Sequence, residues 1–177
     1  MGATSSGDFL GIYLNDHLAA ASGGVELARR AVSARRACDE RELLSGLADE
    51  VAADRRALLT IMRTLEIPVR RYKMLAGWAA EKAGRLKLNG RLRGRSPLSD
   101  LVELEGLLLA VEGKAAGWRT LLTIAEREPK LDANQLRDLR NRAEAQGALL
   151  ERLRLSTAGK LFRQAQPAGS GALPRVT

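Results

Sequence analysis

Apolar residues recur at intervals of three and four along most of the chain, which is the period of a helix that buries one face. The first series lies in residues 8–33 and consists of Leu10, Leu14, Leu18, Ala21, Val25, Ala28 and Val32. A second series runs from Leu43 to Leu65 and stops near Glu66, because Pro68 disfavours a helical conformation in the residue before it. Two long helices are therefore predicted before residue 70.

Two more helices are predicted in the second half of the chain. The first begins after Pro97 and ends before Pro129. Its apolar stripe consists of Leu101, Leu104, Leu108, Val111, Ala115, Trp118 and Leu122. Asp132 and Gln135 have the spacing of a capping box, so a fourth helix begins there and carries its apolar residues as far as Leu161.

The lengths of the connections predict how these helices are arranged. The first and second helices, like the third and fourth, are separated by about seven or eight residues, which predicts two antiparallel hairpins. Residues 67–96 are long enough to travel the length of a bundle, about 37 Å for helices of 25 residues. The second and third helices are thus expected to run in the same direction.

The long crossover itself has two patterns. Residues 69–82 have a helical period, whereas residues 85–93 alternate leucine with basic residues around Asn89-Gly90, which suits a small ribbon or an irregular loop. The fold predicted from the sequence is an all-α four-helix bundle with a long, partly helical crossover. It consists of one domain, residues 8–163, with flexible termini at residues 1–7 and 164–177.

Two hairpins joined by one long crossover form the topology of ferritin-like bundles. Over residues 8–163 the arrangement resembles the ferritin-like superfamily. The segments FLGIYLNDHLAAASGGVELARRA and AEKAGRLKLNGRLRGRSPLSDLVELEGLLLAVEGK are similar to a family of uncharacterised proteins from high-GC Gram-positive bacteria. The second resemblance implies no known activity, whereas the first implies a metal site.

A di-iron carboxylate site normally takes a Glu from each of two helices and a Glu-x-x-His motif from each of the other two. The chain has a single histidine, so it cannot form this pair of motifs. Polar residues nevertheless fall on or beside the apolar stripes near the middle of the bundle: His17, Glu50, Asp54, Glu112, Arg142 and Gln146. His17 and Asp54 are expected at similar height in the first hairpin, within reach of each other.

Three interpretations of this polar layer remain open. The favoured one is a network of hydrogen bonds and ion pairs, because an unpaired buried charge is costly. In the second, His17, Glu50, Asp54 and Glu112 hold a single Zn, Mn or Fe ion. In the third, the side chains face water. No nucleophile accompanies His17 and no second histidine accompanies Cys38, so we expect a non-enzymatic protein without an organic cofactor.

The charge of the chain is concentrated in the crossover. The 177 residues have a net charge of +8, and residues 69–95 alone contain nine basic residues and one acidic residue, again +8. The helices are therefore neutral on balance, and the crossover is a candidate contact surface for an anion. Its predicted contact residues are Arg70, Arg71, Lys73, Arg85, Lys87, Arg91, Arg93 and Arg95.

Several partners would suit this basic segment. It can pair with acidic residues of the neighbouring helices, which is the favoured interpretation, or it can bind an acidic protein, a second copy or nucleic acid. Nucleic acid is less favoured, because the nearby aromatics Tyr72 and Trp78 do not lie among the arginines. A homodimer is a further expectation, since three apolar residues fall outside the assigned stripes: Phe9, Leu27 and Leu155.

Two features indicate the compartment. The longest unbroken apolar run, Leu107 to Val111, is far shorter than a membrane span, so no membrane partner is expected. Cys38 cannot form an intramolecular disulfide, since it is the only cysteine, and we expect it to be a free thiol in a loop of a cytoplasmic protein. Together these features predict a structural or interaction module built on helices.

Overall fold

The computed structural model describes residues 6–35, 37–70 and 97–164. They form four helices, α1 (Ser6–Ala34), α2 (Cys38–Thr64), α4 (Pro97–Ala125) and α5 (Ala133–Gln164), and contain no strand. The all-α class and the four main helices are therefore confirmed. The pattern predicted for residues 85–93 and nearly all of that for 69–82 lie outside the described residues, and so do most residues of the two termini.

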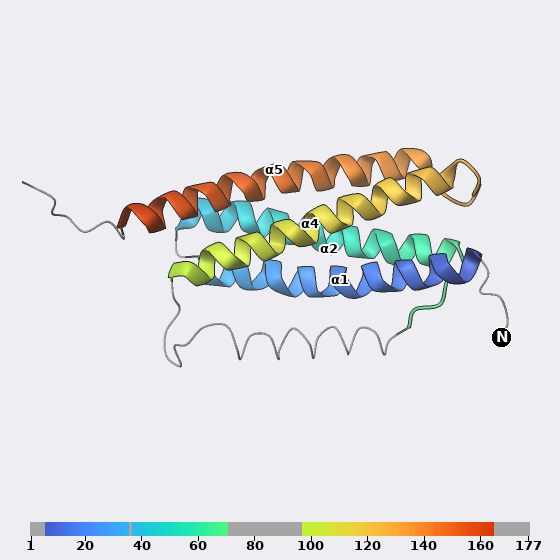
Figure 1. Cartoon of the computed structure of the whole chain (residues 1–177), viewed down its shortest axis with the longest axis horizontal. Coiled ribbons are helices and arrows are strands. Elements are labelled where there is room, and N and C mark those ends of the chain that lie inside the picture. Colours follow the sequence, from blue (N-terminus) through green and yellow to red (C-terminus); the bar gives the residue numbers. More distant parts are fainter. Residues whose placement is uncertain (1–5, 36, 71–96, 165–177) are drawn as a thin grey trace, which may run out of the picture.

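Ion pairs at the two ends of the bundle fix the directions of the helices. At one end Arg35, just after α1, pairs with Asp100 at the start of α4, and Lys160 near the end of α5 pairs with Glu40 at the start of α2. At the other end, Lys130, which follows α4, pairs with Glu66, which follows the C-cap residue of α2. Helices α2 and α4 thus run in the same direction, as Figure 1 shows, and the helices that pack side by side are antiparallel.

The end of α2 is set by its backbone. Glu66 adopts a left-handed conformation with φ 59°. The N–H of Ile67 donates to the carbonyl of Met62 at 2.9 Å, and the N–H of Glu66 donates to that of Arg63 at 3.0 Å. This is the hydrogen-bond pattern of a Schellman motif, and Pro68 follows it. The helix therefore ends within two residues of the position predicted from the sequence.

Asn15 ties the start of the crossover to α1. Its buried side chain donates to the carbonyls of Gly11 and Pro68, at 2.8 and 3.1 Å, and accepts a hydrogen bond of 2.6 Å from the N–H of Arg70. The chain that leaves α2 is thus held against the first half of α1. The sequence analysis assigned no role to Asn15.

The connections differ slightly from those predicted. Residues 35–37 join α1 to α2, so Cys38 is the first residue of α2 and not part of a loop as predicted, and its thiol is free and exposed. Asp39 and Glu40 in the first turn of α2 favour this earlier start, because acidic side chains stabilise a helix N-terminus. At the start of α5, Asp132 accepts hydrogen bonds from the N–H groups of Asn134 and Gln135, which confirms the predicted cap.

The apolar core has two parts. One lies toward the end where α1 begins and consists of Leu14, Leu18, Leu58, Ile61, Met62, Ala115, Trp118, Leu121, Leu131, Leu136, Leu139 and Ala143. The other lies toward the opposite end and consists of Val25, Ala28, Ala31, Leu44, Leu47, Val51, Leu104, Leu107, Val111 and Leu150. The buried Asp54 and Gln146 fall between these two sets along α2 and α5. The middle of the bundle is therefore where its polar chemistry lies.

None of the described helices combines the length and the apolar composition that are needed to cross a lipid bilayer.

Candidate functional site

Asp54 is the centre of the polar layer that joins α2, α4 and α5. Its side chain is 1% exposed. One carboxylate oxygen accepts hydrogen bonds from the guanidinium of Arg142, the one from Nε at 2.8 Å. The other accepts from Lys114 Nζ at 2.5 Å and from Gln146 Nε2 at 3.2 Å. Gln146 in turn accepts from Lys114 and donates to Glu50 at 2.9 Å. The carboxylate is thus fully engaged by its neighbours.

The charges in this layer compensate one another. The side chain of Lys114 is only 13% exposed, and burial lowers its pKa more than the attraction of Asp54 raises it. Arg142 adds a second cation at Asp54, and Glu50 adds a second anion through Gln146. An isolated buried carboxylate would cost several kcal/mol, and these partners offset that cost. Asp54, Arg142, Gln146 and Glu50 therefore form a network of the kind that the sequence analysis favoured, although His17 and Glu112 are not part of it.

The four residues predicted as metal ligands are not brought together. Glu112 is exposed, and its carboxylate lies over Gly147 on α5, where an added Cβ would be 3.1 Å from Oε1. Glu50 is exposed and held by Gln146, whereas His17 lies on α1 and Asp54 is occupied by cations. Within residues 6–35, 37–70 and 97–164, no group of three or more His, Cys, Asp and Glu side chains is placed to hold a metal ion.

Lys114 is the functional residue of the layer that the sequence analysis missed. It lies three residues after Val111 and seven after Leu107, both of which are buried, so it falls within the buried stripe of α4. A basic residue at such a position is the signal that would have identified the partner of Asp54. Arg142 and Gln146, in contrast, were placed in the layer from their positions on α5.

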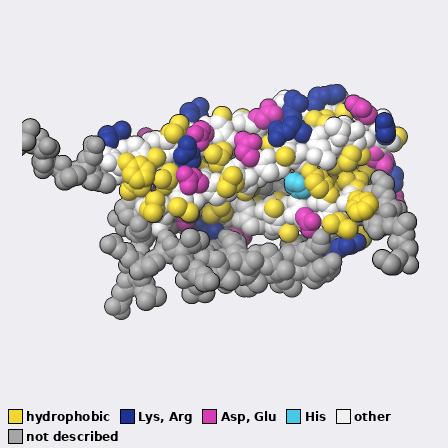
Figure 2. Space-filling model, in the orientation of Figure 1, with side chains coloured by type: hydrophobic (Ala, Val, Ile, Leu, Met, Phe, Trp, Pro, Cys, Tyr) yellow, Lys and Arg dark blue, Asp and Glu magenta, His cyan; other side chains and the backbone are white. Residues whose placement is uncertain are grey.

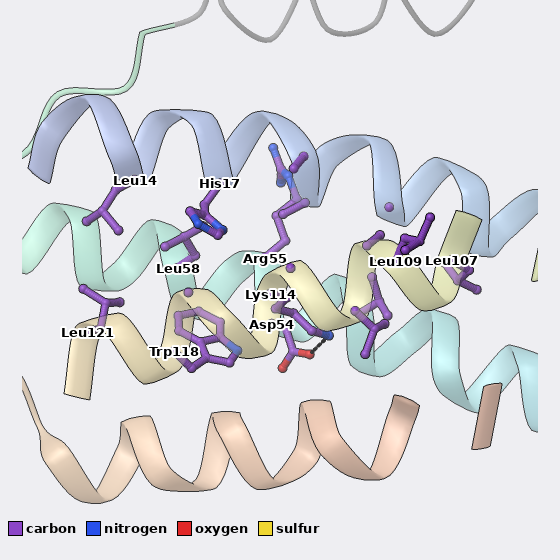
Figure 3. A pocket seen from close by; sticks show the side chains of 18 residues that line it. Leu14, His17, Asp54, Arg55, Leu58, Leu107, Leu109, Lys114, Trp118 and Leu121 are labelled. Carbon is purple, nitrogen blue, oxygen red and sulfur yellow. Dashed lines mark hydrogen bonds and ion pairs between the residues drawn. The ribbon is translucent and has the colours of Figure 1, made fainter. Parts of the chain in front are cut away.

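A cavity of about 170 Å³ lies beside the polar layer, between α1, α2 and α4. Small residues form much of its wall, namely Ala20, Ala21 and Gly24 on α1 and Ala110, Gly113 and Gly117 on α4. An added Cβ at Gly24 would be 3.8 Å from the Cβ of Ala110. The two helices are therefore neighbours at this point, and a side chain at Gly24 would make an ordinary van der Waals contact with α4. The rest of the wall consists of five leucines, two valines, Trp118 and four polar or charged residues, several of which Figure 3 labels.

His17 and Asp54 both line this cavity, which confirms their similar height, but they face different neighbours. Figure 3 shows His17 next to α1, away from the Lys114–Asp54 ion pair. The imidazole lies against the ring of Tyr13, with ring centroids 4.4 Å apart and the ring planes inclined at 60°, and it packs on Gly117, where an added Cβ would be 2.9 Å from Cε1. Partial burial lowers the pKa of His17 more than Asp16 raises it. Figure 2 shows this histidine at the surface, beside hydrophobic side chains.

The three apolar residues expected at a dimer interface do not form one patch. Phe9 and Leu155 are exposed, but Phe9 lies near the start of α1 and Leu155 toward the end of α5, at opposite ends of the bundle. Leu27 instead packs on α4, where an added Cβ at Gly106 would be 3.3 Å from its Cδ2. A dimer through these three residues is thus not supported. Of the predicted basic contact residues, Arg70 is described, and the other seven lie outside the described residues.

Comparison with protein-family models, with curated proteins and with solved structures gives no match for this chain. Its class is therefore defined by its own fold and site. It is an all-α bundle of long helices whose centre is ion-paired on one side and hollow on the other.

Proposed function

We propose that this chain is a non-enzymatic interaction module on a bundle of ferritin-like topology, and that its basic segment, residues 69–95, binds an acidic protein partner. The ferritin-like assignment is supported by the shared direction of α2 and α4 and by the antiparallel packing of neighbouring helices. The non-enzymatic role is supported by Asp54, whose oxygens are engaged by Lys114, Arg142 and Gln146.

The distribution of charge is the observation that carries the binding role. The described residues contain 19 basic and 20 acidic side chains, a net charge of −1, whereas the whole chain has a net charge of +8. Figure 2 shows Lys and Arg mixed with Asp and Glu over the visible face of the helices. The excess of positive charge therefore belongs to residues outside the described helices, and most of it falls in the crossover.

Two acidic residues that might have paired with the basic segment already have partners within the bundle. Asp54 pairs with Lys114 and Arg142, and Glu105 on α4 pairs with Arg154 on α5 at 3.6 Å. The segment is also attached firmly to the bundle at its start, through the hydrogen bond from the N–H of Arg70 to Asn15. A bundle that carries a concentrated basic segment is suited to an acidic partner.

The test compares two variants with the same net charge. R91A/R93A/R95A removes three charges from the basic segment, whereas R56A/R127A/R152A removes three from exposed positions on or beside the helices. Each variant has a net charge of +5, three below the parent. We expect the first to bind fluorescent poly-L-glutamate about tenfold more weakly than the parent at about 150 mM salt, and the second to change by less than about twofold.

Equal weakening in the two variants would show that only total charge matters and would refute the proposal. The same titration with duplex DNA separates the alternative partner. Tighter binding to DNA than to polyglutamate, lost in R91A/R93A/R95A, would replace the acidic protein by nucleic acid.

A further inference from the structure

Exposed apolar side chains are concentrated on the outer side of α4 and α5. Eight large apolar residues are exposed in the described part of the chain, and five of them lie on these two helices: Leu98, Val102, Leu109, Leu155 and Phe162. Between 48% and 73% of each side chain is exposed. Figure 2 shows hydrophobic side chains gathered on the visible face, over the end of α5 and the start of α4. We call these five residues the α4/α5 patch.

The spacing of these residues puts them on one surface. The three on α4 are four and seven residues apart and the two on α5 are seven apart, so each set lies along one line of its helix. Glu105 lies on the α4 line and Glu151 lies on the α5 line. Arg154 pairs with both carboxylates, at 3.6 and 2.7 Å, so the two lines flank a single ion-paired cluster. The patch is therefore continuous across the two helices and not two separate faces.

An apolar surface of this kind indicates contact with another surface. Exposed apolar residues that are scattered singly are normal, whereas a group of them rimmed by charged residues marks an interaction site. Large side chains such as Phe162 and Leu109 lose their contact with water when a partner covers them, which favours association. The charges around the patch then decide which partner fits.

These charges have opposite signs on the two helices. Residues 97–106 of α4 contain three acidic side chains and no basic one, a charge of −3. Residues 151–164 of α5 contain four basic side chains and one acidic side chain, a charge of +3. Some of these groups pair within the chain, but the side chain of Glu105 is still 47% exposed, and Arg152 and Arg163 are exposed. A surface with an acidic half and a basic half is complementary to a second copy of itself.

We propose that the α4/α5 patch is the interface of a homodimer whose two-fold axis runs parallel to the helices. This rotation places α4 of each copy on α5 of the other at the same height. Leu98 and Val102 then meet Leu155 and Phe162 of the second copy, and the acidic start of α4 faces the basic end of α5. An axis across the helices would instead place α4 on α4 and α5 on α5, with like charges together.

This interface differs from the dimer predicted from the sequence, because it leaves out Phe9 and Leu27. It also contains no residue of the basic segment. The dimer is therefore independent of the binding role proposed above, and each can fail without the other.

A matched pair of variants tests the apolar part of the interface by sedimentation velocity of the full chain. Phe162→Asp places a charge in the patch, whereas Phe9→Asp makes the same change at the opposite end of the bundle. The two side chains are 60% and 62% exposed, so the variants differ in position and not in burial. We expect the parent to dimerise, Phe162→Asp to raise the dissociation constant at least about tenfold, and Phe9→Asp to change it by less than about twofold. A salt concentration of about 150 mM limits the repulsion between the two positively charged chains.

Charge reversals test the orientation of the two copies. E103K/E105K makes the start of α4 basic, and R152E/R163E makes the end of α5 acidic. Each variant alone should dimerise about tenfold more weakly than the parent, because its two helices then carry the same sign. An equal mixture of the two should form a heterodimer about as tight as the parent dimer, since opposite charges meet again at both contacts. R56E/R127E, at exposed positions outside the patch, should change the dissociation constant by less than about twofold.

Three results would overturn the proposal. The first is a parent chain that stays monomeric up to about 1 mM, which leaves the patch to another occupant. The second is equal weakening by Phe162→Asp and Phe9→Asp. The third is a mixture of the two charge-reversal variants that associates no more tightly than either variant alone. Recovery in the mixture also shows that both variants are folded, since an unfolded chain presents no interface.

Discussion

At the same height of the bundle, one side is filled by ion pairs and the other side is hollow. On the side of α5, Asp54 is enclosed by long polar side chains from two helices, Lys114, Arg142 and Gln146. On the side of α1, alanine and glycine form much of the wall, and a cavity remains. The difference shows that a buried carboxylate dictates its surroundings, because its charge must be compensated. An apolar wall of small residues has no such requirement and can leave space.

The largest effect on stability is expected from removing the buried carboxylate of the polar layer. Asp54→Ala leaves Lys114 and Arg142 without their shared anion, and should lower the free energy of unfolding by about 3–5 kcal/mol. Urea denaturation followed by circular dichroism measures this change. Asp138→Ala, at an exposed position of α5, is the matched control and should change stability by less than about 0.5 kcal/mol. Similar values for the two variants would mean that the ion pairs do not hold the centre together.

A smaller effect is expected from removing one cation. Lys114→Met keeps the apolar stem and leaves Asp54 with Arg142 and Gln146, so the loss should be about 1–2 kcal/mol by the same denaturation. The loss is limited because burial already opposes the charge of Lys114, as its lowered pKa indicates. A loss as large as that of Asp54→Ala would show that Arg142 contributes nothing at this site.

The hollow side is tested by two glycines on one helix that both line the cavity. An added Cβ at Gly117 would lie 2.9 Å from Cε1 of His17, whereas one at Gly113 would meet nothing within 4 Å. Gly113→Ala should therefore stabilise the protein by about 0.5–1 kcal/mol through helix propensity. Gly117→Ala must displace the imidazole, and should be less stable than Gly113→Ala by about 1–2 kcal/mol. Thermal unfolding of both variants measures the difference. Equal stabilities would show that His17 is not held against α4.

The smallest effect is a dependence of stability on pH. His17 has a folded pKa below its ordinary value of about 6.5, so the unfolded chain binds more protons between the two values. The free energy of unfolding should rise with pH through that window and level off above pH 6.5. His17 is the only histidine, and His17→Gln should remove this component from a series of denaturation curves between about pH 5.5 and 7.5. An unchanged profile in the variant would assign the dependence to other groups.

The sequence was a good guide where periodicity or chain length decides the structure. The four apolar stripes located the helices, and the long interval before Pro97 predicted the shared direction of α2 and α4. Asp54 and Gln146 were found because a polar residue within an apolar stripe has to be buried with a partner. Lys114 is also a charged residue on the buried face of its helix. It lies one position before Ala115 of the stripe that was assigned from the sequence, so its burial was not predicted.

What the sequence determined by itself is the set of helices, their order and directions, and the need for a compensated charge at the centre, since these depend on period, length and burial along a single helix. Only the tertiary structure decided which cation reaches Asp54, that Glu112 turns to α5, that His17 packs on Gly117, and that a cavity remains on the side of α1. These outcomes depend on the rotation of each helix about its axis and on the spacing between helices. Both are set by side chains that come from different parts of the chain and meet only in the folded bundle.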